Sequence, residues 1–235
     1  MTTAPSRRRA VLAEILVLVA VLVAFERLHT LVGKDVALAT ENARRVQWLE
    51  QALHLDVELS MNRWLVQHDV LVTPTVLFYR LYYAVLLGVL LWVLFRRTDV
   101  YPHVRSALVA MAALALLVYW AYPLSPPRFA LAGVVDVVAA HDPFGPRASH
   151  SSNYTAMPSL HVGWSALAAY ALWYAERARH PRAALLAWVF PALMVAVVFT
   201  TGNHYVLDVV GSALLLVASI ATAHLWSRLR RPSSA

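Results

Sequence analysis

The chain of 235 residues contains no cysteine. This absence excludes disulfide bonds, thiolate nucleophiles and cysteine-ligated metal sites. Charged residues are also scarce: they make up 14% of the chain, whereas apolar residues make up 60%. A typical soluble domain contains about 25% charged residues. The composition therefore predicts an integral membrane protein.

Six apolar runs predict six helical spans, and several of them approach the ~20 residues that a helix needs to cross a bilayer. The two shortest runs are expected to have their outer ends inside a helix bundle. The first run lacks a closing cleavage site with small residues, so it is expected to remain as a span. The predicted fold is an all-α membrane bundle of six transmembrane helices at residues 10–31, 71–95, 107–122, 159–175, 183–201 and 205–226.

The basic residues predict the orientation of these spans. With six spans, four arginine-bearing segments fall on one face, which the positive-inside rule makes cytoplasmic. We therefore expect a multi-pass protein of the cell membrane with both termini in the cytoplasm. The net charge of +7 is a topology signal, and no basic stripe or stacking platform accompanies it to indicate nucleic-acid binding. The segments contain Arg7, Arg8 and Arg9; Arg96, Arg97 and Arg105; Arg177, Arg179 and Arg182; and Arg228, Arg230 and Arg231.

The chain is interpreted as one domain, 1–235, without internal repeats. Residues 1–9 and 230–235 are expected to be mobile tails, and residues 70–226 form the expected catalytic core. Residues 35–68 are too polar to span, but their apolar positions have helical spacing and Trp48 and Trp64 suit the headgroup level. They predict one or two amphipathic helices on the outer membrane surface between spans one and two; an ordinary soluble loop is the alternative.

Two motifs carry most of the functional information: Met-Pro-Ser-Leu-His at residues 157–161 and Thr-Thr-Gly-Asn-His-Tyr-Val-Leu-Asp at residues 200–208. Residues i and i+4 share a helix face, so Asp208 is expected to hold Nδ1–H of His204 and leave Nε2 free. His161 opens the fourth span at the same predicted membrane face. This arrangement suits nucleophilic attack by His204 and protonation of a leaving group by His161.

Arg128 is the expected phosphate ligand, because its planar guanidinium matches phosphate oxygens. Ser159 lies at a helix start, where it could cap the helix and also bind an anion. Arg147 and Asn203 are further candidates for phosphate contact. Arg80, well within the second span, is expected in an internal ion pair with Glu14 or Glu26. No group of residues has zinc-like ligand spacing, so neither a metal nor a cofactor is expected.

These residues resemble a known family. Residues 158–161 and His204-x-x-x-Asp208 are similar to the second and third signatures of the type 2 phosphatidic acid phosphatase superfamily, and Pro126-Pro127-Arg128 resembles a shortened first signature. The fuller stretches 157–164 and 201–208 look most like the inositolphosphorylceramide synthase, or aureobasidin-resistance-like, branch. The resemblance implies a six-helix core and a metal-independent phosphohistidine mechanism. It implies that His204 is the nucleophile, Asp208 its orienting acid, and His161 the acid and base.

Two positions depart from the superfamily pattern. Ala121 stands where the first signature usually has lysine, and Val197-Val198 replace the usual Ser-Arg of the third signature. Two phosphate-binding cations are thus missing from their expected places.

The predicted function is a membrane lipid phosphotransferase or phosphatase that acts at the extracytoplasmic face on a phospholipid or polyprenyl phosphate. The acceptor is either an alcohol, including the case of inositol-phosphate transfer, or water, which would make the protein a phosphatase. A non-enzymatic transporter is the less favoured alternative, because transporters place ionisable residues near the membrane midplane. A soluble haloperoxidase-like protein is excluded by the apolar spans.

Overall fold

The computed structural model describes residues 7–141 and 154–230, and this part of the chain is all-α, with no β-strand. Only an isolated bridge joins Leu124 and Thr155. The helices are α1 (Arg7–His29), α2 (Val36–Ala52), α3 (Glu58–Val66), α4 (Asp69–Arg96), α5 (Tyr101–Ala121), α6 (Pro127–Ala130), α7 (Val137–His141), α8 (Leu160–Glu176), α9 (Pro181–Leu185), the 3₁₀ helix η1 (Leu186–Trp188), α10 (Val189–Thr200) and α11 (Val206–Leu229).

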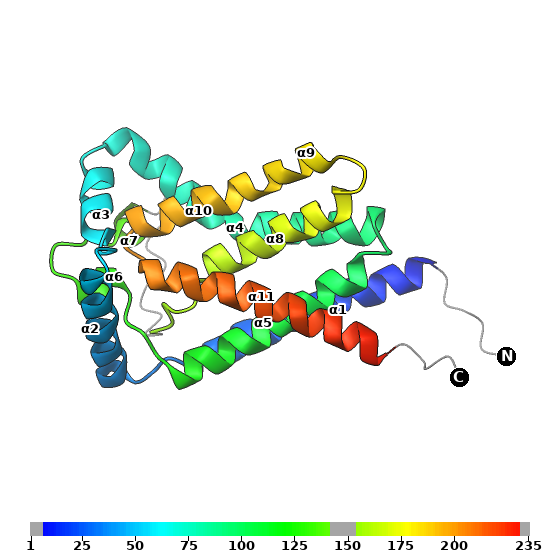
Figure 1. Ribbon diagram of the computed structural model, residues 1–235, viewed down its shortest axis with the longest axis horizontal. Helices are drawn as coiled ribbons and strands as arrows, with labels where there is room; N and C mark the ends of the chain where they lie inside the picture. The colour runs from blue at the N-terminus through cyan, green and yellow to red at the C-terminus, as the bar shows by residue number, and fades with distance from the viewer. Residues whose placement is uncertain (1–6, 142–153, 231–235) are drawn as a thin grey trace.

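Each of the six apolar runs is helical, with α9, η1 and α10 forming one segment. These segments run along the long axis of the bundle in Figure 1. Four of them are long and apolar enough to cross a membrane: Asp69–Arg96, Tyr101–Ala121, Pro181–Thr200 and Val206–Leu229. The 17-residue α8 is only about 26 Å long at 1.5 Å per residue. The helical class is therefore confirmed, whereas crossing by α1 and α8 stays a prediction.

The start of α1, the α4–α5 and α8–α9 connections and the end of α11 lie at one end of the bundle (Figure 1). This is the arrangement expected for six segments that alternate in direction. α1 begins at Arg7, so Arg7, Arg8 and Arg9 are helical rather than part of the predicted tail. The rest of that tail, and residues 231–235 of the other one, lie outside the described residues.

α8 is the central helix of the bundle and packs against α4, α5, α10 and α11. Its buried face is rich in small residues, which let neighbouring backbones approach closely. Trp164 is the largest buried side chain of α8: it is 1% exposed, and its ring centroid lies 5.1 Å from that of Phe25 and 5.2 Å from that of Tyr83. The start of α8 is thereby fixed relative to α1 and α4. The small residues of its buried face are Gly163, Ser165, Ala166, Ala168, Ala169, Ala171 and Ala175.

α1 lies along α5, to which an ion pair joins it. The guanidinium of Arg105 lies 2.5 and 2.6 Å from the two carboxylate oxygens of Glu14. Of the two carboxylates expected to pair with Arg80, Glu14 is therefore paired with Arg105 of α5, whereas a pair between Arg80 and Glu26 stays a prediction.

α2 and α3 cross the opposite end of the bundle, at the left of Figure 1. The predicted helices of this stretch are thus present, and Trp48 and Trp64 are both exposed. Their placement on a membrane surface stays a prediction. Within the fold, α2 and α3 cover the start of α11, which contains the end of the second motif.

Two buried glutamates cap that start. Glu58 of α3 accepts a hydrogen bond from the backbone N–H of Val206 at 3.1 Å, and Glu50 of α2 accepts one from Leu207 at 2.7 Å. The first N–H groups of a helix have no partner within the helix, and its dipole favours negative charge there. Burial raises the pKa of Glu50 to about 8, and Glu58 adds to this shift through its charge and a hydrogen bond. Burial raises the pKa of Glu58 as well.

These shifts predict a pH dependence of stability. The folded protein binds more protons than the unfolded chain between about pH 4.5 and pH 8, so its free energy of unfolding decreases as pH rises through this window. Glu50→Gln keeps an acceptor for the Leu207 N–H and removes the titrating charge. We expect the decrease in Tm from pH 6 to pH 9 to be smaller in this variant, as measured by thermal unfolding in detergent.

Glu41→Gln is the matched control, because Glu41 lies on the same helix with its side chain 45% exposed. This variant should keep the wild-type dependence of Tm on pH. An equally steep decrease in Glu50→Gln would show that Glu50 is not the titrating group.

Candidate active site

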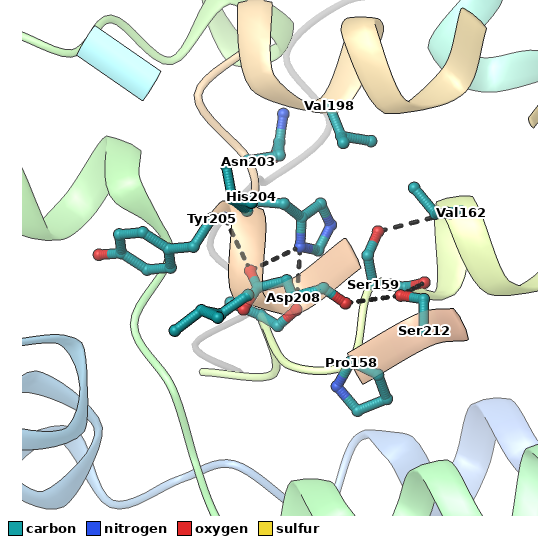
Figure 2. A network of polar contacts seen from close by, with 12 residues as sticks. Pro158, Ser159, Val162, Val198, Asn203, His204, Tyr205, Asp208 and Ser212 are labelled. Atoms are coloured by element: carbon teal, nitrogen blue, oxygen red, sulfur yellow. Dashed lines mark hydrogen bonds and ion pairs between the residues drawn. The ribbon is translucent and has the colours of Figure 1, made fainter. Parts of the chain in front are cut away.

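The two sequence motifs meet where α8 and α11 begin (Figure 2). The backbone N–H of Ser159 donates to the carbonyl oxygen of Asp208 at 3.4 Å. The hydroxyl of Ser212 lies 2.9 Å from the carbonyl oxygen of Ser159 and 2.7 Å from that of Asp208. The starts of the two helices are therefore tied together, which brings the motif histidines to one place.

His204 and Asp208 form the predicted pair. Nδ1 of His204 lies 3.1 Å from Oδ2 of Asp208 and 2.9 Å from the carbonyl oxygen of Ala156. Both partners are acceptors when the carboxylate is ionised, so Nδ1 carries the proton and Nε2 of the neutral ring has a free lone pair. Asp208 is fully buried, and its Oδ2 also accepts from the backbone N–H of Tyr205 at 2.9 Å. The carboxylate thus holds both the ring and the backbone that carries it.

His161 lies in the first turn of α8, with its ring centroid 5.9 Å from that of His204. The ring of Tyr79 stacks on it at 4.0 Å, and the ring of Tyr82 lies 4.2 Å away. Both tyrosines come from α4. They fix the plane of the imidazole. The sequence indicates this aromatic face of α4 through its spacing, because Tyr79, Tyr82 and Tyr83 share one side of the helix.

Arg128 points toward the same place from α6. Its guanidinium donates to Oδ1 of Asn203 at 2.5 Å and pairs with Asp136 at 3.2 Å. The amide nitrogen of Asn203 in turn donates to Oγ1 of Thr201 at 2.8 Å. Asn203 therefore orients Arg128, a role that the sequence did not distinguish from direct phosphate contact.

Ser159 is the N-cap of α8: its hydroxyl accepts from the backbone N–H of Val162 at 3.4 Å. Ser159 is fully buried and does not contribute to the cavity wall. Of its two predicted roles, the cap is present, and phosphate contact by Ser159 stays a prediction. Pro158 directly precedes this cap. Arg147 lies outside the described residues.

A short segment, residues 154–156, supplies the Ala156 carbonyl to His204. It is held on both sides: the N–H of Tyr154 donates to Gly33 at 2.8 Å, and residues 154 and 156 exchange hydrogen bonds with Leu124 at 2.7 and 3.2 Å. Gly33 has a φ of +66°, and a Cβ there would come within 2.7 Å of Thr155. The turn after α1 therefore needs glycine to bring this segment close.

A cavity of about 680 Å³ opens beside the two histidines. This volume lies within the range of small-molecule sites. Arg128, Asn203, His161 and His204 line one part of it, and Tyr82, Tyr83, Trp164 and Phe25 give the rest an aromatic wall. Arg80 and His29, which belong to neither motif, also line it. The arrangement presents two imidazoles and cationic donors to one partly open space.

Ala121 and Val198 supply no charge to this space. Val198 is fully buried among apolar side chains that include Met194 and Phe199, and Ala121 is an exposed residue at the end of α5. The departures noted in the two signatures are thus real differences in the charge of the site.

A protein-family model described as the PAP2 superfamily matches residues 44–222, well over half of the chain. Searches among curated proteins and among solved structures return no match. The family match includes both motifs, Arg128 and every residue that joins the starts of α8 and α11. The chain therefore belongs to the PAP2 superfamily.

Proposed function

We propose that this protein is a membrane-embedded enzyme that cleaves a lipid phosphoester or phosphoanhydride through a phosphohistidine on His204. Membership of the PAP2 superfamily, whose members are usually phosphatases, supports activity on lipid phosphates. One observation carries the choice of nucleophile: Nδ1 of His204 is occupied by two acceptors, at 2.9 and 3.1 Å, on a ring that lines the cavity.

In the first step, Nε2 of His204 attacks phosphorus and the bond to the leaving oxygen breaks. Asp208 stabilises the positive charge that develops on the ring, while protonated His161 donates a proton to the leaving oxygen. In the second step, neutral His161 removes a proton from the acceptor, whose oxygen attacks phosphorus and releases His204. Arg128 neutralises the phosphate oxygens, and no metal ion takes part in either step.

The acceptor decides between two activities of the same site. An alcohol acceptor gives a phosphotransferase, including transfer of inositol phosphate, whereas water gives a lipid phosphate or polyprenyl diphosphate phosphatase. The motif stretches 157–164 and 201–208, through their resemblance to the inositolphosphorylceramide synthase branch, favour the alcohol. The family match itself is to the superfamily.

We further propose that the site faces the extracytoplasmic side of the cell membrane, with six spans and both termini in the cytoplasm. The arginine-bearing connections lie at one end of the bundle, and the site lies at the other (Figure 1). The positive-inside rule then assigns the arginine-bearing end to the cytoplasm.

His204→Ala should abolish turnover, by about 10⁴-fold or more, because the nucleophile is removed. Asp208→Asn keeps the size of the side chain but cannot stabilise the imidazolium, and we expect kcat to fall by about 10²- to 10⁴-fold. Both are measured as phosphate release or transfer by purified protein, with thermal unfolding as the check on folding. The exposed His180 at the other end of the bundle gives the control His180→Ala, which should retain activity. Near-normal turnover by folded His204→Ala would disprove the nucleophile.

His161→Ala should slow reactions with poor leaving groups most, because such groups need a proton as they depart. For an aliphatic lipid alcohol we expect a loss of about 10²- to 10⁴-fold in kcat, and a much smaller one for an aryl phosphate. The ratio of the two rate constants is the measurement. If both substrates lost rate equally, His161 would act by position or charge and not as the general acid.

The activity itself is tested by a product assay with purified protein in detergent and EDTA. Labelled phosphatidic acid, phosphatidylinositol and polyprenyl diphosphate are offered with and without inositol or diacylglycerol, beside His204→Ala. We expect a His204-dependent lipid product that has gained a headgroup. Phosphate release that ignores every acceptor would make the protein a phosphatase, and no His204-dependent product from any substrate would contradict the proposed function.

A further inference from the structure

The imidazole of His161 contacts two tyrosine rings of α4. The ring centroid of Tyr79 lies 4.0 Å away with an interplanar angle of 23°, and that of Tyr82 lies 4.2 Å away at 50°. Residues three apart are neighbours on one helix face, and α4 packs along α8, which carries His161. One turn of α4 therefore supplies two aromatic contacts to the same side chain.

These contacts restrict how His161 can move. Tyr79 is 7% exposed, and both tyrosines line the cavity that His161 and His204 also line. A general acid must bring its proton within hydrogen-bond reach of the leaving oxygen. An imidazole with a buried ring stacked on its face cannot turn about its Cβ–Cγ bond unless that ring moves. Tyr79 thus limits the direction in which His161 can present a proton.

The proposed first step requires a positive charge on His161, and this charge has like charges nearby. Arg128 and Arg80 act electrostatically on the imidazole, and so does His204. Arg128 is partly offset by Asp136 at 3.2 Å, and Arg80 has an interaction of its own. The repulsion is thereby reduced, but each of the three cationic groups still opposes a further positive charge at His161.

The tyrosine rings supply an attraction. The face of a tyrosine ring is electron-rich and attracts a cation within about 6 Å of its centroid. Tyr79 lies nearly parallel to the imidazole and presents its face directly, whereas Tyr82 is inclined and contributes less. The carboxylate of Asp208 contacts Nδ1 of His204 instead. Because the rings have no net charge, they favour a protonated imidazole without competing with phosphate for a guanidinium.

We propose that Tyr79 and Tyr82 are positioning residues for proton transfer by His161: Tyr79 sets the direction of the imidazole, and both rings stabilise it while it is protonated. This inference rests on the proposed function, because it takes His161 as the general acid. The effect of the rings on the imidazole can nevertheless be measured without turnover.

The first test compares two variants of Tyr79 in turnover assays. Tyr79→Leu removes the ring face and keeps an apolar side chain, whereas Tyr79→Phe removes only the hydroxyl. With an aliphatic lipid phosphate, we expect kcat to fall about 10-fold in Tyr79→Leu and less than about 3-fold in Tyr79→Phe, with KM nearly unchanged. An aryl phosphate, whose leaving group departs without a proton, should lose little rate in either variant.

The second test needs no turnover. Histidines labelled with ¹³C are observed by NMR in purified full-length protein in detergent, and the His161 signal is identified by its absence in His161→Ala. We expect His161 to lose its proton at a pH about one unit lower in Tyr79→Leu than in the wild type or Tyr79→Phe, since one unit corresponds to the 10-fold change above. A His161 signal that titrates alike in all three proteins, or in none, would overturn the proposal.

Phe78→Leu is the matched control, because Phe78 precedes Tyr79 on α4 but packs on Phe190, with a centroid distance of 5.0 Å, and does not line the cavity. It should keep the wild-type kcat and the wild-type titration of His161. Equal losses with the aliphatic and the aryl substrate in folded Tyr79→Leu would contradict the proposal. A shifted titration in Tyr79→Leu of a protein without turnover would support the role of the ring and contradict the proposed function alone.

Discussion

The hydrogen bonds of the Asp208 carboxylate are the interaction on which the rest of the site depends. Oδ2 accepts from Nδ1 of His204 and from the backbone N–H of Tyr205, while the carbonyl of the same residue accepts from Ser159 and Ser212. Asp208 thus sets the tautomer of His204, the start of α11 and the approach of α8. The helix bundle buries this residue away from solvent.

Three buried carboxyl groups gather at the start of α11. Three carboxylates, those of Asp208, Glu50 and Glu58, accept from successive backbone N–H groups. The helix dipole and those N–H groups favour the charges, but burial opposes them, and the raised pKa of Glu50 reflects this opposition. α2 and α3 contribute two of these three carboxyl groups. Because they cap the start of α11, which carries Asp208, they belong with the elements that position the site.

Much of this was readable from the sequence. Period and length gave the six apolar helices, because both depend on local geometry. The His204–Asp208 pair was predicted from a shared helix face, but α11 begins at Val206, after His204. The pair forms instead because Asp208, in the first turn, reaches back to the His204 ring and to the backbone N–H of Tyr205. The role of Glu50 and Glu58 was not readable, since they meet α11 across about 150 residues of chain. For the same reason, the sequence alone could not show whether Ser159 caps a helix or binds phosphate. It also could not show whether Asn203 orients Arg128 or binds phosphate. That Arg80 lines the same cavity as the two histidines was not readable either, because the sequence alone does not show which helices surround a cavity.

The short segment 154–156 makes the orientation of His204 depend on distant parts of the chain. Its backbone is fastened to Gly33, in the turn after α1, and to Leu124, which follows α5. Both therefore position the Ala156 carbonyl that accepts from Nδ1 of His204. A substitution at Gly33 would thus reach the imidazole through the backbone of this segment, although Gly33 itself does not line the cavity.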